Sequence, residues 1–148
     1  MRKIVWALFS MLLILPAALQ AQEEASRYMV DGLQIDLKSV AVEKDTLTVT
    51  LSLVSFRMDP REFTLNTFAT QVVDAEGNGH LYSTLTMGRV MVRLEDQQNY
   101  LHYLLEEDKT VPLRLQVANW KGEKPKQLIL VFQDSEEEGK FIQETVGL

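Results

Sequence analysis

The chain has 148 residues, with 15 basic and 21 acidic side chains, and it contains no cysteine. The acidic balance argues against nucleic-acid binding, which depends on cationic contacts with phosphate, and it disfavours attachment to an anionic membrane surface. The absence of cysteine excludes disulfides, thiol catalysis, thiolate metal sites and a lipid anchor attached through cysteine at a cleavage point.

The first 21 residues have the order of a secretory signal peptide. Arg2 and Lys3 form a positive start, residues 4–15 form an apolar run, and small residues precede a cleavage point after Ala21. The apolar run is short for a membrane span, which needs about 20 residues. We therefore expect a secreted or periplasmic protein with no membrane insertion after signal cleavage. An uncleaved N-terminal anchor is the alternative.

Cleavage at that point leaves 148 − 21 = 127 residues, numbered 22–148. Removing two basic residues leaves 13 against 21 acidic ones, a net charge of −8, which is typical of a soluble domain. This length is enough for one domain with its own core. We expect a single domain over residues 22–148 with a short acidic C-terminal tail that begins at Ser135 and contains Glu136, Glu137 and Glu138.

A period of two dominates the mature chain. Residues 46–53 read TLTVTLSL, so every odd position is apolar and every even one carries a small hydroxyl, which is typical of a half-buried strand. Residues 33–37 alternate in the same way, but Val40 and Val42 continue in the opposite phase. A β-bulge near Lys38–Ser39 is expected to cause that change.

Further strands are expected wherever alternating or continuously apolar runs recur between turn signals. No sustained period of 3.6 residues, which would indicate helices, occurs after the signal peptide. The expected strands cover residues 63–73, 79–86, 89–94, 100–105, 113–117 and 127–132, with a possible short last strand near residues 141–146.

Seven or eight short strands separated by frequent turns predict an all-β fold. Two antiparallel sheets packed face to face would bury one face of every alternating strand, as in an immunoglobulin-like sandwich. A closed barrel of the same strand count requires similar alternation, so it stays open as an alternative.

This layout resembles small secreted immunoglobulin-like proteins of bacteria. The resemblance implies the sandwich fold and the exported location, and it brings no catalytic residues. The cysteine pair around a core tryptophan, the hallmark of true immunoglobulin domains, is absent. The resemblance depends on the pattern at residues 33–42, 47–53, 63–78 (ending in DAEGN), 113–117 and 128–132.

Residues 74–80, DAEGNGH, contain the strongest chemical signal. Asp74, Glu76 and Asn78 supply oxygen ligands at alternate positions before a glycine, as in the first half of a calcium-binding EF-hand loop. The twelfth position is Leu85, which cannot bind calcium, and the flanking segments are strands. A tight hairpin turn explains the same residues, and no cofactor other than calcium is indicated.

Two histidines and several aromatic residues are the remaining candidates. His80 and His102 occur without a nucleophile motif or zinc-type spacing, and we interpret both as exposed. Trp120 is expected either to contact a partner or to cap the open end of the core. Tyr100 and Tyr103, with Tyr82, could form an aromatic patch that binds a partner or stabilises the sheet.

The sequence therefore predicts an exported, non-enzymatic β-sandwich that binds or assembles with an envelope or extracellular protein. Two alternatives use the 74–80 loop. One is a calcium-dependent adhesion module, and the other is a small metal-dependent hydrolase that uses Asp74, Glu76 and His80.

Overall fold

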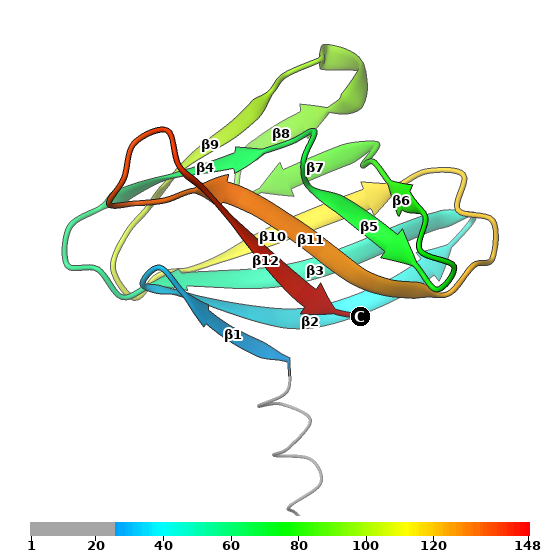
Figure 1. Cartoon of the computed structure of the whole chain (residues 1–148), viewed down its shortest axis with the longest axis horizontal. Coiled ribbons are helices and arrows are strands. Elements are labelled where there is room, and N and C mark those ends of the chain that lie inside the picture. The colour runs from blue at the N-terminus through cyan, green and yellow to red at the C-terminus, as the bar shows by residue number, and fades with distance from the viewer. Residues whose placement is uncertain (1–25) are drawn as a thin grey trace, which may run out of the picture.

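The computed structural model describes residues 26–148, which form twelve β-strands in two sheets (Figure 1). The predicted signal peptide lies outside these residues. The described part contains one turn of 3₁₀ helix, η1 (Leu94–Asp96), and no α-helix. None of its helical structure is long and apolar enough to cross a membrane.

All strands within each sheet pair in antiparallel fashion. The first sheet has the order β1-β2-β3-β10-β7-β8, with β1 Arg27–Val30, β2 Leu33–Glu43, β3 Thr46–Ser55, β10 Thr110–Val117, β7 Thr84–Met87 and β8 Val90–Arg93. The second has the order β6-β5-β11-β4-β9, with β6 Gly79–His80, β5 Gln71–Asp74, β11 Pro125–Gln133, β4 Arg61–Asn66 and β9 Tyr100–Leu105; β12 (Phe141–Gly147) also pairs with β11.

The core lies between the two sheets, and the alternation of β3 explains why. Leu47, Val49, Leu51 and Leu53 share one face of the strand and are all buried, whereas most of the intervening hydroxyl residues are only partly buried. On the second sheet, Leu128, Leu130 and Phe132 of β11 occupy the facing layer, where the Phe132 ring lies 5.3 Å from that of Phe63. The predicted burial of Leu47, Val49, Leu51 and Leu53 is confirmed.

The predicted bulge in the first long strand is confirmed. The pairing of β2 with β3 changes register between Leu37 and Ser39. One extra residue shifts the side-chain phase by one position, so Val40 takes the orientation that an odd-numbered residue would otherwise have. The apolar pattern of residues 127–132 also predicted a central strand correctly, since β11 pairs with β12 on one edge and with β5 and β4 on the other.

The predicted strand count is too low, because β1 was not among the expected strands and two runs read as single strands are each divided. The 63–73 run breaks after Asn66, whose side-chain oxygen accepts the Ala69 amide and whose carbonyl accepts the Thr70 amide, which closes a turn. The 79–86 run breaks around Tyr82, because β6 belongs to the second sheet and β7 to the first. The last strand, β12, is seven residues long and fully paired with β11.

Candidate functional site

Three side chains that can bind a metal converge at one end of the molecule. Asp74 ends β5, His80 ends β6, and Glu123 lies in the loop between β10 and β11. His80 Nε2 lies 2.7 Å from Asp74 Oδ2 and 3.7 Å from Glu123 Oε2. The Asp74 side chain is fully buried, whereas His80 and Glu123 are 31% and 40% exposed. Solvent therefore reaches the cluster from the side of His80 and Glu123.

The hairpin sequence orients the Asp74 carboxylate. Its Oδ1 accepts the backbone amides of Glu76 and Asn78, at 2.9 and 3.0 Å, while Gly77 takes the positive φ of 89° that the turn requires. Glu76 and Asn78, predicted as calcium ligands, thus approach Asp74 through their main chains, and both residues are exposed. The arrangement matches the hairpin-turn alternative, and calcium binding stays a prediction.

Trp120 holds the loop that carries Glu123. Its indole Nε1 donates a hydrogen bond of 2.7 Å to the Glu123 carbonyl, and its ring centroid lies 4.6 Å from that of His80. Only 3% of Trp120 is exposed. The residue therefore caps the core, and its burial leaves little surface for the partner contact that the sequence also suggested.

The pKa values of the two carboxylates in the cluster are shifted in opposite directions. The hydrogen bond with His80 lowers the pKa of Asp74, assisted by hydrogen bonds with the Glu123 side chain and with the amides of Asn78 and Glu76, and these effects outweigh burial. A hydrogen bond with Asp74, together with burial, raises the pKa of Glu123. Asp74 is thus held ionised, while Glu123 binds a proton more readily than an isolated glutamate.

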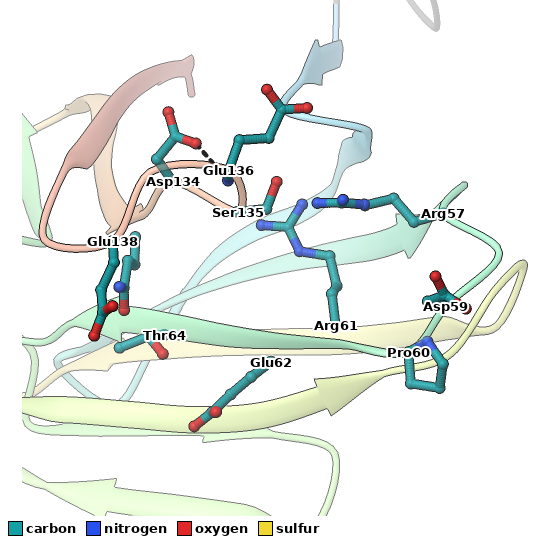
Figure 2. Close-up of a pocket in the computed structure, with 11 residues that line it drawn as sticks. Arg57, Asp59, Pro60, Arg61, Glu62, Thr64, Asp134, Ser135, Glu136 and Glu138 are labelled. Atoms are coloured by element: carbon teal, nitrogen blue, oxygen red, sulfur yellow. Dashed lines mark hydrogen bonds between the residues drawn. The ribbon is translucent and has the colours of Figure 1, made fainter.

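A separate surface pocket of about 410 Å³ lies beside the start of β4. Two arginines and five carboxylates line it, so its charge is predominantly negative. Figure 2 shows the Arg57 side chain extending toward Arg61, with Glu62 and Glu138 on another part of the wall. Side chains of both signs therefore meet in this pocket.

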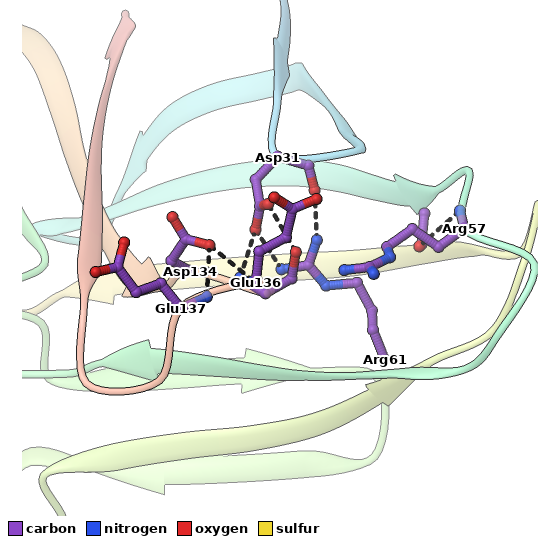
Figure 3. A network of polar contacts seen from close by, with 8 residues as sticks. Asp31, Arg57, Arg61, Asp134, Glu136 and Glu137 are labelled. Carbon is purple, nitrogen blue, oxygen red and sulfur yellow. Dashed lines mark hydrogen bonds and ion pairs between the residues drawn. The ribbon is translucent and has the colours of Figure 1, made fainter.

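Arg61 is mainly a structural residue of that pocket, because its side chain is only 5% exposed. It donates to the backbone carbonyl of Asp31 and forms an ion pair of 2.9 Å with the Asp31 carboxylate (Figure 3). Ser135 donates to the same carboxylate through its amide and its hydroxyl. Burial alone would raise the pKa of Asp31, but the bonds from Ser135 and the charge of Arg61 lower it overall.

Aromatic side chains gather on the outer face of the second sheet. The Tyr100 ring from β9 stacks with that of Phe141 from β12, with centroids 6.0 Å apart and an interplanar angle of 10°. His102 lies next to Tyr100 on β9, and its Nδ1 contacts Glu62 at 3.0 Å. Leu104 completes the exposed side of β9, at 59% exposure.

The predicted pairing of Tyr100 with Tyr103 in one patch does not occur, because alternate residues of β9 face opposite ways. Tyr100 lies on the outer face, whereas Tyr103 is partly buried against the core and approaches Gly88. Tyr82 is fully buried. Of the three tyrosines, only Tyr100 is available at the outer surface.

Sequence reasoning missed Glu123 and the buried Asp31–Arg61 pair. Glu123 lies in a polar loop with no motif, and it reaches Asp74 because Pro125 pairs with Asp74 across the β5–β11 contact. The turn at Asp31-Gly32 could have been predicted from the sequence, since aspartate and glycine tolerate the positive φ that both adopt. Its arginine partner is 30 residues away in the sequence, and no local pattern indicates it.

Comparisons with known proteins do not assign the chain to a family. No protein-family model matches the chain, and no curated protein matches it. Among solved structures, the chain is similar to the yjhA protein from Bacillus subtilis at 13% identity and a TM-score of 0.46, over 82% of this chain and 95% of that one.

Proposed function

We propose that this protein is an exported, non-enzymatic module of immunoglobulin-like type that binds or assembles with another protein in the bacterial envelope or outside the cell. The observation that carries the proposal is the unpaired edge of β9. This six-residue strand pairs only with β4 among the described strands, so one of its edges is unpaired. Strand edges of this kind offer backbone donors and acceptors to a partner chain.

The side chains on the outer face of the second sheet support a protein partner. Tyr100, Leu104 and Phe141 are exposed, and the stacked rings of Tyr100 and Phe141 form a rigid apolar surface next to polar His102. Aromatic side chains with polar neighbours are enriched in protein interfaces. We name Tyr100, His102, Leu104 and Phe141 the outer aromatic face.

Capture experiments with tagged protein and an envelope fraction from its own organism test this proposal. A specific partner should bind the wild-type chain and lose most of its binding in Leu104→Lys, which places a charge on the outer aromatic face. Met29→Lys is the matched control, because Met29 is equally exposed, at 61%, but lies on edge strand β1 of the other sheet.

The result that would overturn the proposal is capture of the same proteins by all three chains, or of none by the wild type. Circular dichroism should confirm that both variants fold. Fractionation of the producing cells tests the exported location separately, because a mature chain starting near Gln22 should appear outside the cytoplasm.

Metal-dependent hydrolysis is the second candidate. The convergence of Asp74 and His80 favours it, although Glu76 is exposed and lies outside the three-residue group, whose third member is Glu123. Hydrolysis of simple ester substrates that is stimulated by an added divalent metal and lost in His80→Gln would support this candidate. Equal rates in the two proteins would exclude it.

A further inference from the structure

The Asp74, His80 and Glu123 side chains form a ligand set assembled from three separate segments. One oxygen or nitrogen atom of each lies within 4.8 Å of the other two, and this is the one such group among residues 26–148. The set combines one imidazole nitrogen with two carboxylate oxygens. Of the calcium ligands predicted from the sequence, Asp74, Glu76 and Asn78, it contains only Asp74.

The spacing of these atoms suits a small cation. Zinc binds histidine nitrogen and carboxylate oxygen at about 2.0–2.2 Å in tetrahedral geometry, which places neighbouring ligand atoms roughly 3.4 Å apart. His80 Nε2 lies 2.7 Å from Asp74 and 3.7 Å from Glu123, so the observed separations lie on either side of that value. The ligand atoms of Asp74 and Glu123 also lie within 4.8 Å of each other.

The surroundings hold two of the ligands in place before any ion arrives. The two amides on Asp74 Oδ1 leave its Oδ2 as the atom directed at His80. The Trp120 ring packs against the His80 imidazole, and its indole nitrogen fixes the loop at the Glu123 carbonyl. The Glu123 side chain itself stays partly exposed, which gives an ion and a solvent ligand access.

We propose that Asp74, His80 and Glu123 bind one divalent transition-metal ion of the zinc class, with solvent as the fourth ligand. Two carboxylates and a neutral imidazole supply a charge of −2, which balances a divalent cation. Calcium prefers six to eight oxygen ligands, so a three-ligand site with a nitrogen donor favours zinc over calcium. The ion would join the β5–β6 hairpin to the β10–β11 loop, and this site is independent of the outer aromatic face.

Calorimetric titration of chelator-treated protein with zinc chloride tests the proposal. The wild-type chain should bind one zinc ion, and Glu123→Gln and His80→Gln should each weaken binding by about tenfold or more, as expected when one of three ligands is lost. Glu123→Gln keeps the backbone carbonyl that Trp120 uses, so it reports on the carboxylate alone. Excess calcium or magnesium should leave the zinc affinity unchanged.

His102→Gln is the matched control, because His102 also contacts a carboxylate, that of Glu62, but belongs to no three-ligand group among the described residues. Its zinc affinity should equal that of the wild type. Cobalt in place of zinc gives a second measurement: visible absorption bands of tetrahedral cobalt should appear in the wild type and be lost in Glu123→Gln. Absence of binding by the wild type, or equal affinity in all four proteins, would overturn the proposal, and the latter result would identify adventitious binding elsewhere.

Discussion

The buried ion pair between Asp31 and Arg61 fastens the β1–β2 turn to the second sheet. Arg61 begins β4, and the Asp31 carboxylate also accepts two hydrogen bonds from Ser135, which follows β11. Removing one member of a buried pair is costly because the other charge stays buried without its partner. A single carboxylate thus connects three segments that are distant in the sequence.

We therefore expect Asp31→Asn to lower the free energy of unfolding by about 3 kcal/mol, the usual scale for breaking a buried ion pair. Asparagine keeps the shape of the side chain and tolerates the φ of 51° at this position, so the loss reports the charge together with one hydrogen-bond acceptor, because the side-chain NH2 group cannot accept a bond. Urea unfolding followed by intrinsic fluorescence measures the change.

The matched control is Asp36→Asn, which removes the charge from a similar pair. Its partner Arg27 is 51% exposed, so water can replace the interaction. The expected loss is at most about 1 kcal/mol, as for exposed ion pairs. Equal losses in the two variants would show that the Asp31–Arg61 pair contributes no more than a surface pair does.

At the scale of elements, the β7–β8 hairpin and β9 are fitted closely to each other although they belong to different sheets. Gly88, in the hairpin turn, has a φ of 54°, and a Cβ atom there would lie 2.6 Å from the Tyr103 hydroxyl and 2.7 Å from its ring. A side chain at this position is therefore both strained in its backbone and obstructed by β9.

We expect Gly88→Ala to destabilise the protein by roughly 2–3 kcal/mol, of which about 1–2 kcal/mol comes from the left-handed backbone. Gly139→Ala is the control, because Gly139 has a φ of 80° with nothing within 4 Å of the added Cβ, and it should lose only the backbone part. Thermal unfolding of both variants measures the difference. Equal destabilisation would mean that Tyr103 moves aside without cost.

Strand positions could be predicted from the sequence where the periodicity is local. The 46–53 alternation and the change of phase before Val40 each identified a feature of β3 or β2 correctly. The division of the 63–73 run was missed because the turn after Asn66 contains neither glycine nor proline. The change of sheet around Tyr82 was missed because periodicity does not reveal which sheet a strand joins.

In the candidate site, too, the sequence predicts contacts between neighbouring residues and misses contacts between distant ones. Asp74 and His80 share one hairpin, so their proximity could be inferred from the turn signal between them. Glu123 and Trp120 reach them through the pairing of β5 with β11, which is a contact between distant parts of the chain. Likewise, Tyr100 and Tyr103 face opposite sides of β9 because side chains alternate along a strand. The predicted aromatic patch of Tyr100 and Tyr103 did not take this alternation into account.

At the scale of the whole molecule, one core joins both sheets, and its strands pair across long stretches of sequence. In the central pairing of the first sheet, Thr110 lies opposite Val54 and Val117 opposite Leu47, which are 110 − 54 = 56 and 117 − 47 = 70 residues apart. Closing loops of that length costs chain entropy before the core can form. Neither sheet can bury its apolar face without the other.

We therefore expect one cooperative unfolding transition, with folding on the order of milliseconds to seconds, as in other all-β domains with distant pairings. Trp120 is the one tryptophan after Ala21, and it caps one end of the core, so its fluorescence reports tertiary packing there in a chain that lacks the leader. Far-ultraviolet circular dichroism reports the strands throughout the molecule. The two signals should change at the same urea concentration, because the loop at Trp120 and both sheets depend on the same buried layer. A separate earlier fluorescence change would mean that the end carrying Asp74, His80 and Glu123 opens independently of the core.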